Sequence, residues 1–394
     1  LRGLVGALGN RRPLDAPSVW MIDVAAAGAC IAAVAPQLER PAQDDDIRVV
    51  GGRVEAVAAS DGWRVDRAAT LLRLQAAAGE VASSARLEVV LRPVAARRHA
   101  VDRAAAAVRA VLQRSLEVRA YDPIHDLDHT IGVAPEQWIG WLEPDIAADG
   151  GSVRWSPAVA VEGATLSVED VFGVGHYLDL GELAWAAASA LEAAEWSLAA
   201  RVRHAPGRHI VAPGETVTSI AEDVGIPYPY VLEANPGMRD ELLPGQELAI
   251  PSPDVLVPLQ PVRGKRVMVD LDAQRLQVLE NGAVKWDWPI STGVVTSPTA
   301  VGVFQVQTHE ESAYASNWDL WMPHFLGIYR PLPGAAFMNG LHGFPTRRGR
   351  NLLWTNDLGH PVTYGCVLVG SDNARLLFEW AEAGVLVEIR KGRP

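Results

Sequence analysis

The stretch Thr363-Tyr364-Gly365-Cys366-Val367-Leu368 places a cysteine directly after a glycine and directly before an apolar run. The apolar run is typical of a buried strand, and the glycine lets a substrate or another backbone approach closely. Upstream, Gly340-Leu341-His342-Gly343 places a histidine before a glycine at a second predicted strand end. A cysteine and a histidine that a sheet brings together form the expected couple for acyl transfer, because a thiolate is both a good nucleophile and a good leaving group. Cys366 is therefore the candidate nucleophile.

The segment around this pair is rich in β-favouring residues and turn dipeptides. One clear helix is predicted in it, over 373–383, and Asp372 is expected to cap that helix. Several strands are predicted, at 266–270, 275–279, 284–288, 290–293, 302–306 and 385–389. The order of these strands, together with the Ser-Thr-Gly, His-Gly and Gly-Cys motifs, resembles the catalytic domain of the L,D-transpeptidases (the YkuD-like fold). The resemblance covers residues 264–391.

The resemblance implies roles for several residues. His342 would be the base, the backbone carbonyl of Gly343 would orient its ring, and backbone amides that include the one of Cys366 would hold the oxyanion. Gly365 belongs to the same nucleophile motif. The family usually has a second histidine where this chain has Tyr364, and we interpret that tyrosine as an orienting or oxyanion-stabilising group, since a phenol is a poor general base.

Two further departures from the family pattern lie near the nucleophile. The arginine that often follows the cysteine is missing, and the 342–363 stretch is somewhat long and basic. Arg347 in this stretch is a candidate for binding a stem carboxylate, although a solvated charge run has the same pattern. Thr363 is a further candidate for substrate contact.

A second resemblance covers residues 208–252. The pieces that carry it are Val211-Ala212-Pro213-Gly214-Glu215-Thr216-Val217, the triplet Ala234-Asn235-Pro236, and Leu243-Pro244-Gly245-Gln246-Glu247-Leu248-Ala249-Ile250-Pro251. They resemble a LysM module, a small βααβ fold whose relatives bind N-acetylglucosamine chains of peptidoglycan or chitin. The resemblance implies a sugar groove, and its candidate residues are Gly214, Glu215, Thr216, Asn235 and Pro236. Turns need several of these residue types even where no sugar binds.

The first 204 residues contain a repeat at an offset of roughly 110 residues. Each copy has strands, then Gly-x-x-(Val/Leu)-Asp, then a helix, with Asp66 and Asp179 ending the two signatures. The helices are predicted over 67–78, with Asp66 as the N-cap, and over 180 to about 200. We expect two α+β domains, 1–95 and 96–204, the first without its own leading helix. They resemble the peptidoglycan-binding domains found ahead of L,D-transpeptidase and VanW-type domains. The alternative is that they are spacers.

Composition limits the partners. The 394 residues carry 47 acidic and 35 basic side chains, a formal charge of −12, which argues against a nucleic-acid binder. No apolar run is long enough to span a membrane, although the chain opens with Leu1, so we consider an upstream signal or anchor. Two cysteines cannot form a disulfide framework, and Cys30 is expected to be packed. His125 and His129 have a metal-ligand spacing, but the surrounding residues favour a loop, and we expect neither metal nor cofactor.

The sequence therefore predicts a multidomain α+β protein: two repeated α+β domains, a LysM module and a mainly β catalytic domain. The function that the resemblances imply is peptidoglycan L,D-transpeptidation in a bacterial cell envelope. An acyl-enzyme on Cys366 would form from a tetrapeptide stem and pass to an amine acceptor. Peptidoglycan stems and glycan strands are the expected partners. The alternatives are a non-catalytic wall-binding protein and an L,D-carboxypeptidase that uses the same cysteine.

Overall fold

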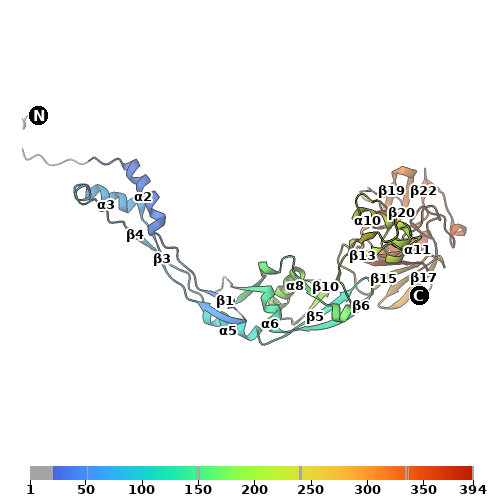
Figure 1. Ribbon diagram of the computed structural model, residues 1–394, viewed down its shortest axis with the longest axis horizontal. Helices are drawn as coiled ribbons and strands as arrows, with labels where there is room; N and C mark the ends of the chain where they lie inside the picture. Colours follow the sequence, from blue (N-terminus) through green and yellow to red (C-terminus); the bar gives the residue numbers. More distant parts are fainter. Residues whose placement is uncertain are drawn as a thin grey trace, which may run out of the picture. The chain divides into compact units, whose positions relative to one another are not determined.

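The computed structural model describes residues 21–50, 52–147, 149, 151–238, 242–332, 335 and 337–392. Contacts divide the chain into two compact units, one with residues 1–115 and 134–158 and the other with 116–133 and 159–394. The start of the expected first domain, residues 1–20, lies outside the described residues. Both units mix helices with strands, which confirms the expected α+β class (Figure 1). Within the described ranges, no helix has the length and apolar character that crossing a bilayer requires.

In the described residues, the first unit opens with three helices and two antiparallel strand pairs: α2 (Val24–Leu38), β1 (Asp46–Val50), β2 (Arg53–Val57), β3 (Gly62–Val65), α3 (Arg67–Ala76), α4 (Ala78–Ser84) and β4 (Leu91–Val94). Helix α3 begins where the sequence predicts, because the Asp66 carboxylate accepts a hydrogen bond from the Ala69 amide at 2.9 Å. Helix α2 buries Ile31 and Ala35. The expectation that Cys30 is packed is wrong: it is exposed, about 100° around the helix from Ile31.

The rest of the first unit comprises α5 (Val101–Val111), α6 (Pro135–Trp138), the short helix η1 (Ile139–Trp141), β7 (Leu142–Ile146) and β8 (Val153–Pro157). Helix α5 contacts both the β1–β2 hairpin and the β7–β8 hairpin. Ala104, Ala105 and Val108 form its buried face. The segment 96–204, which the repeat predicts to be one domain, thus contributes residues to both units.

The second unit begins with two three-stranded sheets, in the orders β11-β5-β6 and β12-β10-β9. Their elements are β5 (Leu116–Asp122), β6 (Leu127–Val133), η2 (Val159–Val161), β9 (Thr165–Ser167), α7 (Glu169–Phe172), β10 (His176–Asp179), α8 (Leu180–Glu192), β11 (Ser197–Arg201) and β12 (Arg203–His204). Asp179 caps α8 through the Glu182 amide, so the second signature also ends at a helix start. Helix α8 ends earlier than the sequence suggests because Ser197 and its successors pair in parallel with Glu117 and the rest of β5.

A small βααβ fold follows: β13 (Gly207–Ile210), α9 (Val217–Val224), α10 (Tyr228–Ala234) and β14 (Glu247–Ile250). The two strands pair antiparallel, with His209 opposite Leu248. Ile220, Val231 and Leu248 are completely buried in its core. The expected order of elements is confirmed here. The short helix η3 (Pro253–Leu256) leads from it into the last part of the chain.

The last part of the chain is built on one large sheet, in which the described residues contribute eleven strands. They are β15 (Lys265–Asp270), β16 (Arg275–Glu280), β17 (Ala283–Ser291), β18 (Gly302–Gln305), β19 (Thr308–Ala315), β20 (Leu320–Tyr329), β21 (Asn339–His342), β22 (Thr346–Arg347), β23 (Arg350–Asn351), β24 (Val367–Val369) and β25 (Leu386–Arg390). The order is β18-β25-β15-β16-β17-β24-β21-β20-β22-β23, with β19 paired to β20. The short helices η4 (Ser316–Trp318) and η5 (Thr355–Asp357) and the helix α11 (Ser371–Trp380) lie in its connections.

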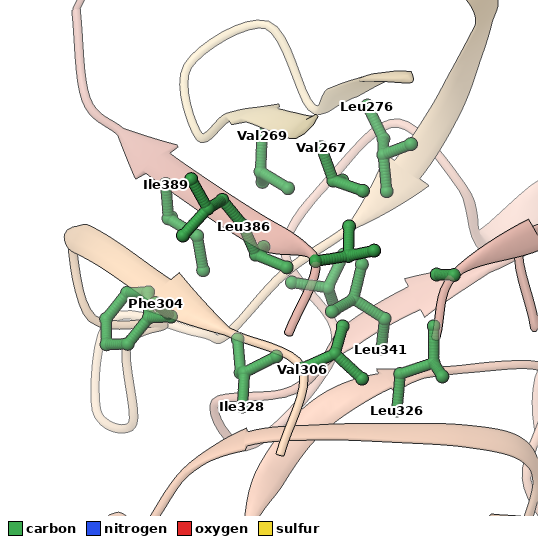
Figure 2. Packing of buried hydrophobic residues seen from close by; sticks show 14 of the residues in the cluster. Val267, Val269, Leu276, Phe304, Val306, Leu326, Ile328, Leu341, Leu386 and Ile389 are labelled. Atoms are coloured by element: carbon green, nitrogen blue, oxygen red, sulfur yellow. The ribbon is translucent and has the colours of Figure 1, made fainter. Parts of the chain in front are cut away.

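The sheet curves around an apolar core. Figure 2 shows Val267 and Val269 of β15 facing Phe304, Leu326 and other side chains from strands of the same sheet. The helix predicted over 373–383 is present but begins earlier, at Ser371 after the N-cap residue Gly370, so the expectation that Asp372 caps it is wrong. The core fixes the sheet to which the candidate catalytic residues are attached.

Candidate active site

His342 and Cys366 come from neighbouring parallel strands. His342 ends β21, and β24 begins immediately after Cys366. The register pairs Leu341 with Val367 and His342 with Leu368. Because side chains alternate between the faces of a sheet, Cys366, two residues before Leu368, lies on the same face as His342. Leu341 and Val367 point the other way, into the apolar core.

The two side chains line one cavity. Its volume is about 490 Å³, and it is bounded mainly by β19, β20, the 337–345 segment and the nucleophile motif. Polar groups on its wall include Asn339, Arg347 and Tyr364, and apolar ones include Met322 and Phe325. The cavity therefore offers a thiol, an imidazole and a mixed polar and apolar wall to one ligand.

The His342 imidazole is held in one orientation and one tautomer. Its Nδ1–H donates to the Gly343 carbonyl oxygen at 2.7 Å, so the lone pair resides on Nε2. The Gly343 amide in turn donates to the Pro323 carbonyl at 2.9 Å, which ties down the residue whose carbonyl orients the ring. Burial lowers the pKa of His342 to about 4, against an opposing effect of the Gly343 carbonyl. The imidazole is consequently neutral near pH 7 and able to accept a proton.

The Cys366 thiol is also neutral at rest. Burial raises its pKa to about 11, although the Gly340 backbone works in the opposite direction. The thiol sulfur lies 3.8 Å from Oδ1 of Asn339, and among the described hydrogen bonds none joins it to His342. The site therefore contains a neutral thiol and a neutral base, and the proton has to move when the thiol attacks a carbonyl.

The turn before the nucleophile is tightly constrained. Gly365 has a φ of +110°, and a Cβ at this position would lie 2.6 Å from Nδ2 of Asn339. The Thr363 hydroxyl donates to the Cys366 carbonyl at 2.6 Å, which closes the turn. Asn339 Nδ2 donates to the buried Tyr329 hydroxyl at 2.9 Å. The neighbouring strand β21, through Asn339, and the turn's own Thr363 thus hold the cysteine in place.

Comparison with known proteins places this site in a family. The model of the L,D-transpeptidase catalytic domain, YkuD, matches residues 264–389. The "Putative L,D-transpeptidase YkuD" of Bacillus licheniformis is 32% identical over 126 residues, which are 30% of this chain and 72% of that protein. The protein of the same name from Bacillus subtilis is 32% identical over 124 residues and is also covered to 72%. The chain belongs to the YkuD family of L,D-transpeptidases.

Two upstream segments match other families. The LysM domain model covers residues 209–251, and a model described as "Putative peptidoglycan binding domain" covers residues 16–83. Solved L,D-transpeptidases resemble the chain as well. The one from Stackebrandtia nassauensis is 23% identical, with 34% of this chain and 60% of that chain covered and a TM-score of 0.27. The one from Mycobacterium smegmatis is 16% identical, with 47% and 90% covered and a TM-score of 0.28.

The remaining candidates around the YkuD cavity differ in their contacts. Tyr364 is 67% exposed at the rim, and the Arg347 guanidinium donates to the Trp318 carbonyl at 2.6 Å. Both line the cavity, as Thr363 does. Reasoning from the sequence missed Asn339. Its signal is a polar residue at the start of the strand that pairs with the nucleophile strand, and it becomes visible only once the strands are paired.

The candidate sugar-binding residues of the LysM domain are largely committed to its own fold. The Asn235 amide group donates to the carbonyls of Val231 and Ala249 and accepts from the Ala249 amide, all at 2.8–2.9 Å. Glu215 accepts from the Ala212 amide and contacts the His209 ring. Thr216 caps α9.

Two more of these candidates lie at turns of the LysM domain. Gly214 has a φ of +88°, and the position that a Cβ would take there has no other atom within 4 Å. Pro236 follows α10 and its C-cap residue. Most polar side-chain atoms of this set are thus engaged within the domain itself.

Proposed function

We propose that this chain is a cell-envelope L,D-transpeptidase that cross-links peptidoglycan through an acyl-enzyme on Cys366. The observation that carries the proposal is the single cavity lined by both Cys366 and His342 in a domain of the YkuD family. The matched LysM and peptidoglycan-binding segments support peptidoglycan as the partner. We place the activity outside the cytoplasm of a bacterium, where that polymer is found.

The first half-reaction forms a thioester. Nε2 of His342 takes the thiol proton as Cys366 Sγ attacks the carbonyl carbon of the diamino-acid residue in a tetrapeptide stem. The tetrahedral intermediate carries its negative charge on oxygen, which backbone amides of the Gly365–Cys366 turn stabilise. The C–N bond then breaks, His342 returns the proton to the nitrogen, and D-Ala leaves as a free amine.

The second half-reaction restores the thiol. An amine on a neighbouring stem attacks the thioester, His342 accepts the proton that the amine loses, and the C–S bond breaks. The proton ends on Cys366 Sγ, so the chain returns to its neutral resting pair. Each step exchanges one acyl bond for another, and the electrons balance without an oxidant or reductant. Gly343 keeps the imidazole aligned throughout, and we assign to Tyr364, which is exposed at the rim, a contact with the incoming stem.

Acylation by a carbapenem tests the nucleophile directly. We expect one adduct per chain by intact mass, lost in Cys366→Ala and retained in Cys30→Ala, the matched control at the exposed second cysteine. Purified muropeptides then distinguish the activities. Release of D-Ala with cross-linked product supports the transpeptidase, and release with hydrolysed stems alone supports the carboxypeptidase. No adduct and no stem exchange in the wild-type chain would remove the enzymatic proposal and leave a wall-binding protein.

A further inference from the structure

Three histidines and one aspartate converge far from Cys366 in the sequence and outside the catalytic domain. They are Asp122 at the end of β5, His125 in the following turn, His176 on β10 and His204 on β12. His176 and His204 are direct cross-strand partners. One potential ligand atom from each of the four side chains lies within 4.8 Å of those of the others. The cluster joins the two small sheets at the start of the second unit.

In two of these rings, the hydrogen bond that Nδ1 donates determines that Nε2 carries the lone pair. His176 Nδ1–H donates to the Gly173 carbonyl at 2.9 Å, and His204 Nδ1–H donates to the Asp254 carboxylate at 3.2 Å. In both rings Nε2 is left with its lone pair, buried and without a hydrogen-bond partner of normal geometry. Histidine ligands of metals have this arrangement, in which the second nitrogen donates to a carboxylate or a backbone carbonyl.

Both nitrogens lie close to a buried carboxylate. His204 Nε2 lies 3.2 Å from Oδ1 of Asp122, and His176 Nε2 lies 3.6 Å from Oδ2. Lone pairs so close to a carboxylate repel it unless a positive charge stands between them. Supplying that charge with a proton on each ring would place two imidazolium rings with their centroids 4.7 Å apart. One divalent cation satisfies both rings at once.

The spacing suits a four-coordinate ion. With bonds of about 2.0–2.1 Å to nitrogen and oxygen, the ligand atoms of a tetrahedral zinc site stand about 3.3 Å apart. The two separations at Asp122 bracket that value. His125 Nδ1 is 2.6 Å from Oδ2 of Asp122, and its half-exposed ring can move outward to become the fourth ligand. Three imidazoles with one carboxylate favour zinc over the oxygen-preferring calcium and magnesium.

We propose that Asp122, His125, His176 and His204 form a structural zinc site. It would fasten the end of β5 to β10 and β12, and through Asp254 to the η3 segment that leads into the catalytic domain. Asp254 also accepts from Arg201 at 3.0 Å and from the His204 amide at 2.8 Å, so this second layer is rigid. His129, which the sequence spacing paired with His125, lies on β6 against Phe172 and takes no part.

Metal content of the full chain, purified without a histidine tag, tests the site. After removal of metal and reconstitution, we expect one zinc per chain by mass spectrometry of the native protein, and the absorption spectrum of a four-coordinate ion when cobalt replaces zinc. His176→Gln and His204→Gln are expected to lose stoichiometric zinc. Asp254→Asn, which removes a hydrogen bond to a ligand, is expected to weaken binding by about 10- to 100-fold. His129→Gln is the matched control and should bind as the wild type does.

The outcomes separate this inference from the proposed function. A wild-type chain that takes up no stoichiometric zinc, or variants at His176 and His204 that keep it, would overturn the site. Equal loss in His129→Gln would overturn it too, because binding would then not depend on the cluster. The carbapenem adduct on Cys366, measured on the same variants, reports that the chain is folded and does not depend on the presence of zinc.

Discussion

Lowering the pH from about 7.5 to about 5 tests how Cys366 loses its proton during acylation. Burial places the pKa of His342 at about 4 and that of the thiol at about 11. At either pH the imidazole is then neutral and ready to accept a proton, and the thiol still carries one. We expect the rate of acylation by a carbapenem to fall by only about 10% over this interval, which is the small loss of neutral imidazole.

Other protonation states of the pair would lower the acylation rate much more over the same pH interval. If the imidazole had its ordinary pKa of 6.5, its neutral fraction, and with it the rate, would fall about 30-fold. If the reaction used free thiolate, and the thiol pKa lay above this pH interval, the rate would fall about tenfold per pH unit, or about 300-fold in all. The three cases differ by enough that the pH dependence alone distinguishes them.

The assay follows adduct formation by intact mass in samples quenched over time at each pH. His342→Gln is the control: it keeps the shape of a polar side chain but cannot accept the proton, and we expect a loss of about 100- to 10,000-fold at neutral pH. A rate that falls with a midpoint near 6.5 in the wild-type chain would refute the argument that burial sets the pKa of His342. A steady tenfold fall per unit, of the kind that free thiolate gives, would refute His342 as the base.

Three further predictions concern stability and contacts. Gly365→Ala should abolish acylation and lower the melting temperature, because its Cβ would lie 2.6 Å from the Asn339 side-chain amide nitrogen and its φ is +110°. The control is Gly349→Ala, where φ is +74° and the Cβ would meet open space; it should cost about 1 kcal/mol of stability and leave acylation unchanged. The unfolding free energy of the wild type should fall by about 3 kcal/mol between pH 6.5 and about 4, since the unfolded chain binds a proton that folded His342 excludes, and denaturant titrations of His342→Gln should lack that decrease. Gly302→Ala should separate the LysM domain from the catalytic domain, because its Cβ would lie 2.2 Å from the Gly225 carbonyl, and limited proteolysis at the joint should reveal it.

Local signals in the sequence predicted local structure well. The caps at Asp66 and Asp179 begin helices in the structure because a cap depends on residues within one turn. The predicted extension of α8 failed for the opposite reason. Residues 197–201 contain alanine and leucine and suit a helix, but their pairing with β5, some eighty positions earlier, holds them as a strand.

The candidate site likewise combines local motifs, which the sequence shows, with contacts between distant segments, which it does not. Cys366 and His342 each stand in a short motif, and their shared cavity follows from the register of two strands. Asn339 contacts the nucleophile across that register and has no motif of its own. The cluster of three histidines and Asp122 spans more than eighty residues, so no spacing in the sequence could show it. The sequence could not predict the contacts that a sheet creates between distant segments.

The packing of the LysM domain changes what its presence means for catalysis. A tethered sugar-binding module raises the local concentration of substrate without any fixed geometry. Here a second cavity, of about 310 Å³, has walls from both domains, with Ile226 and Tyr228 on one side and Trp318 and Tyr364 on the other. Tyr364 lines this cavity and the one that contains Cys366. Under the proposed function, a glycan held by the LysM loops would present its stems from a defined direction.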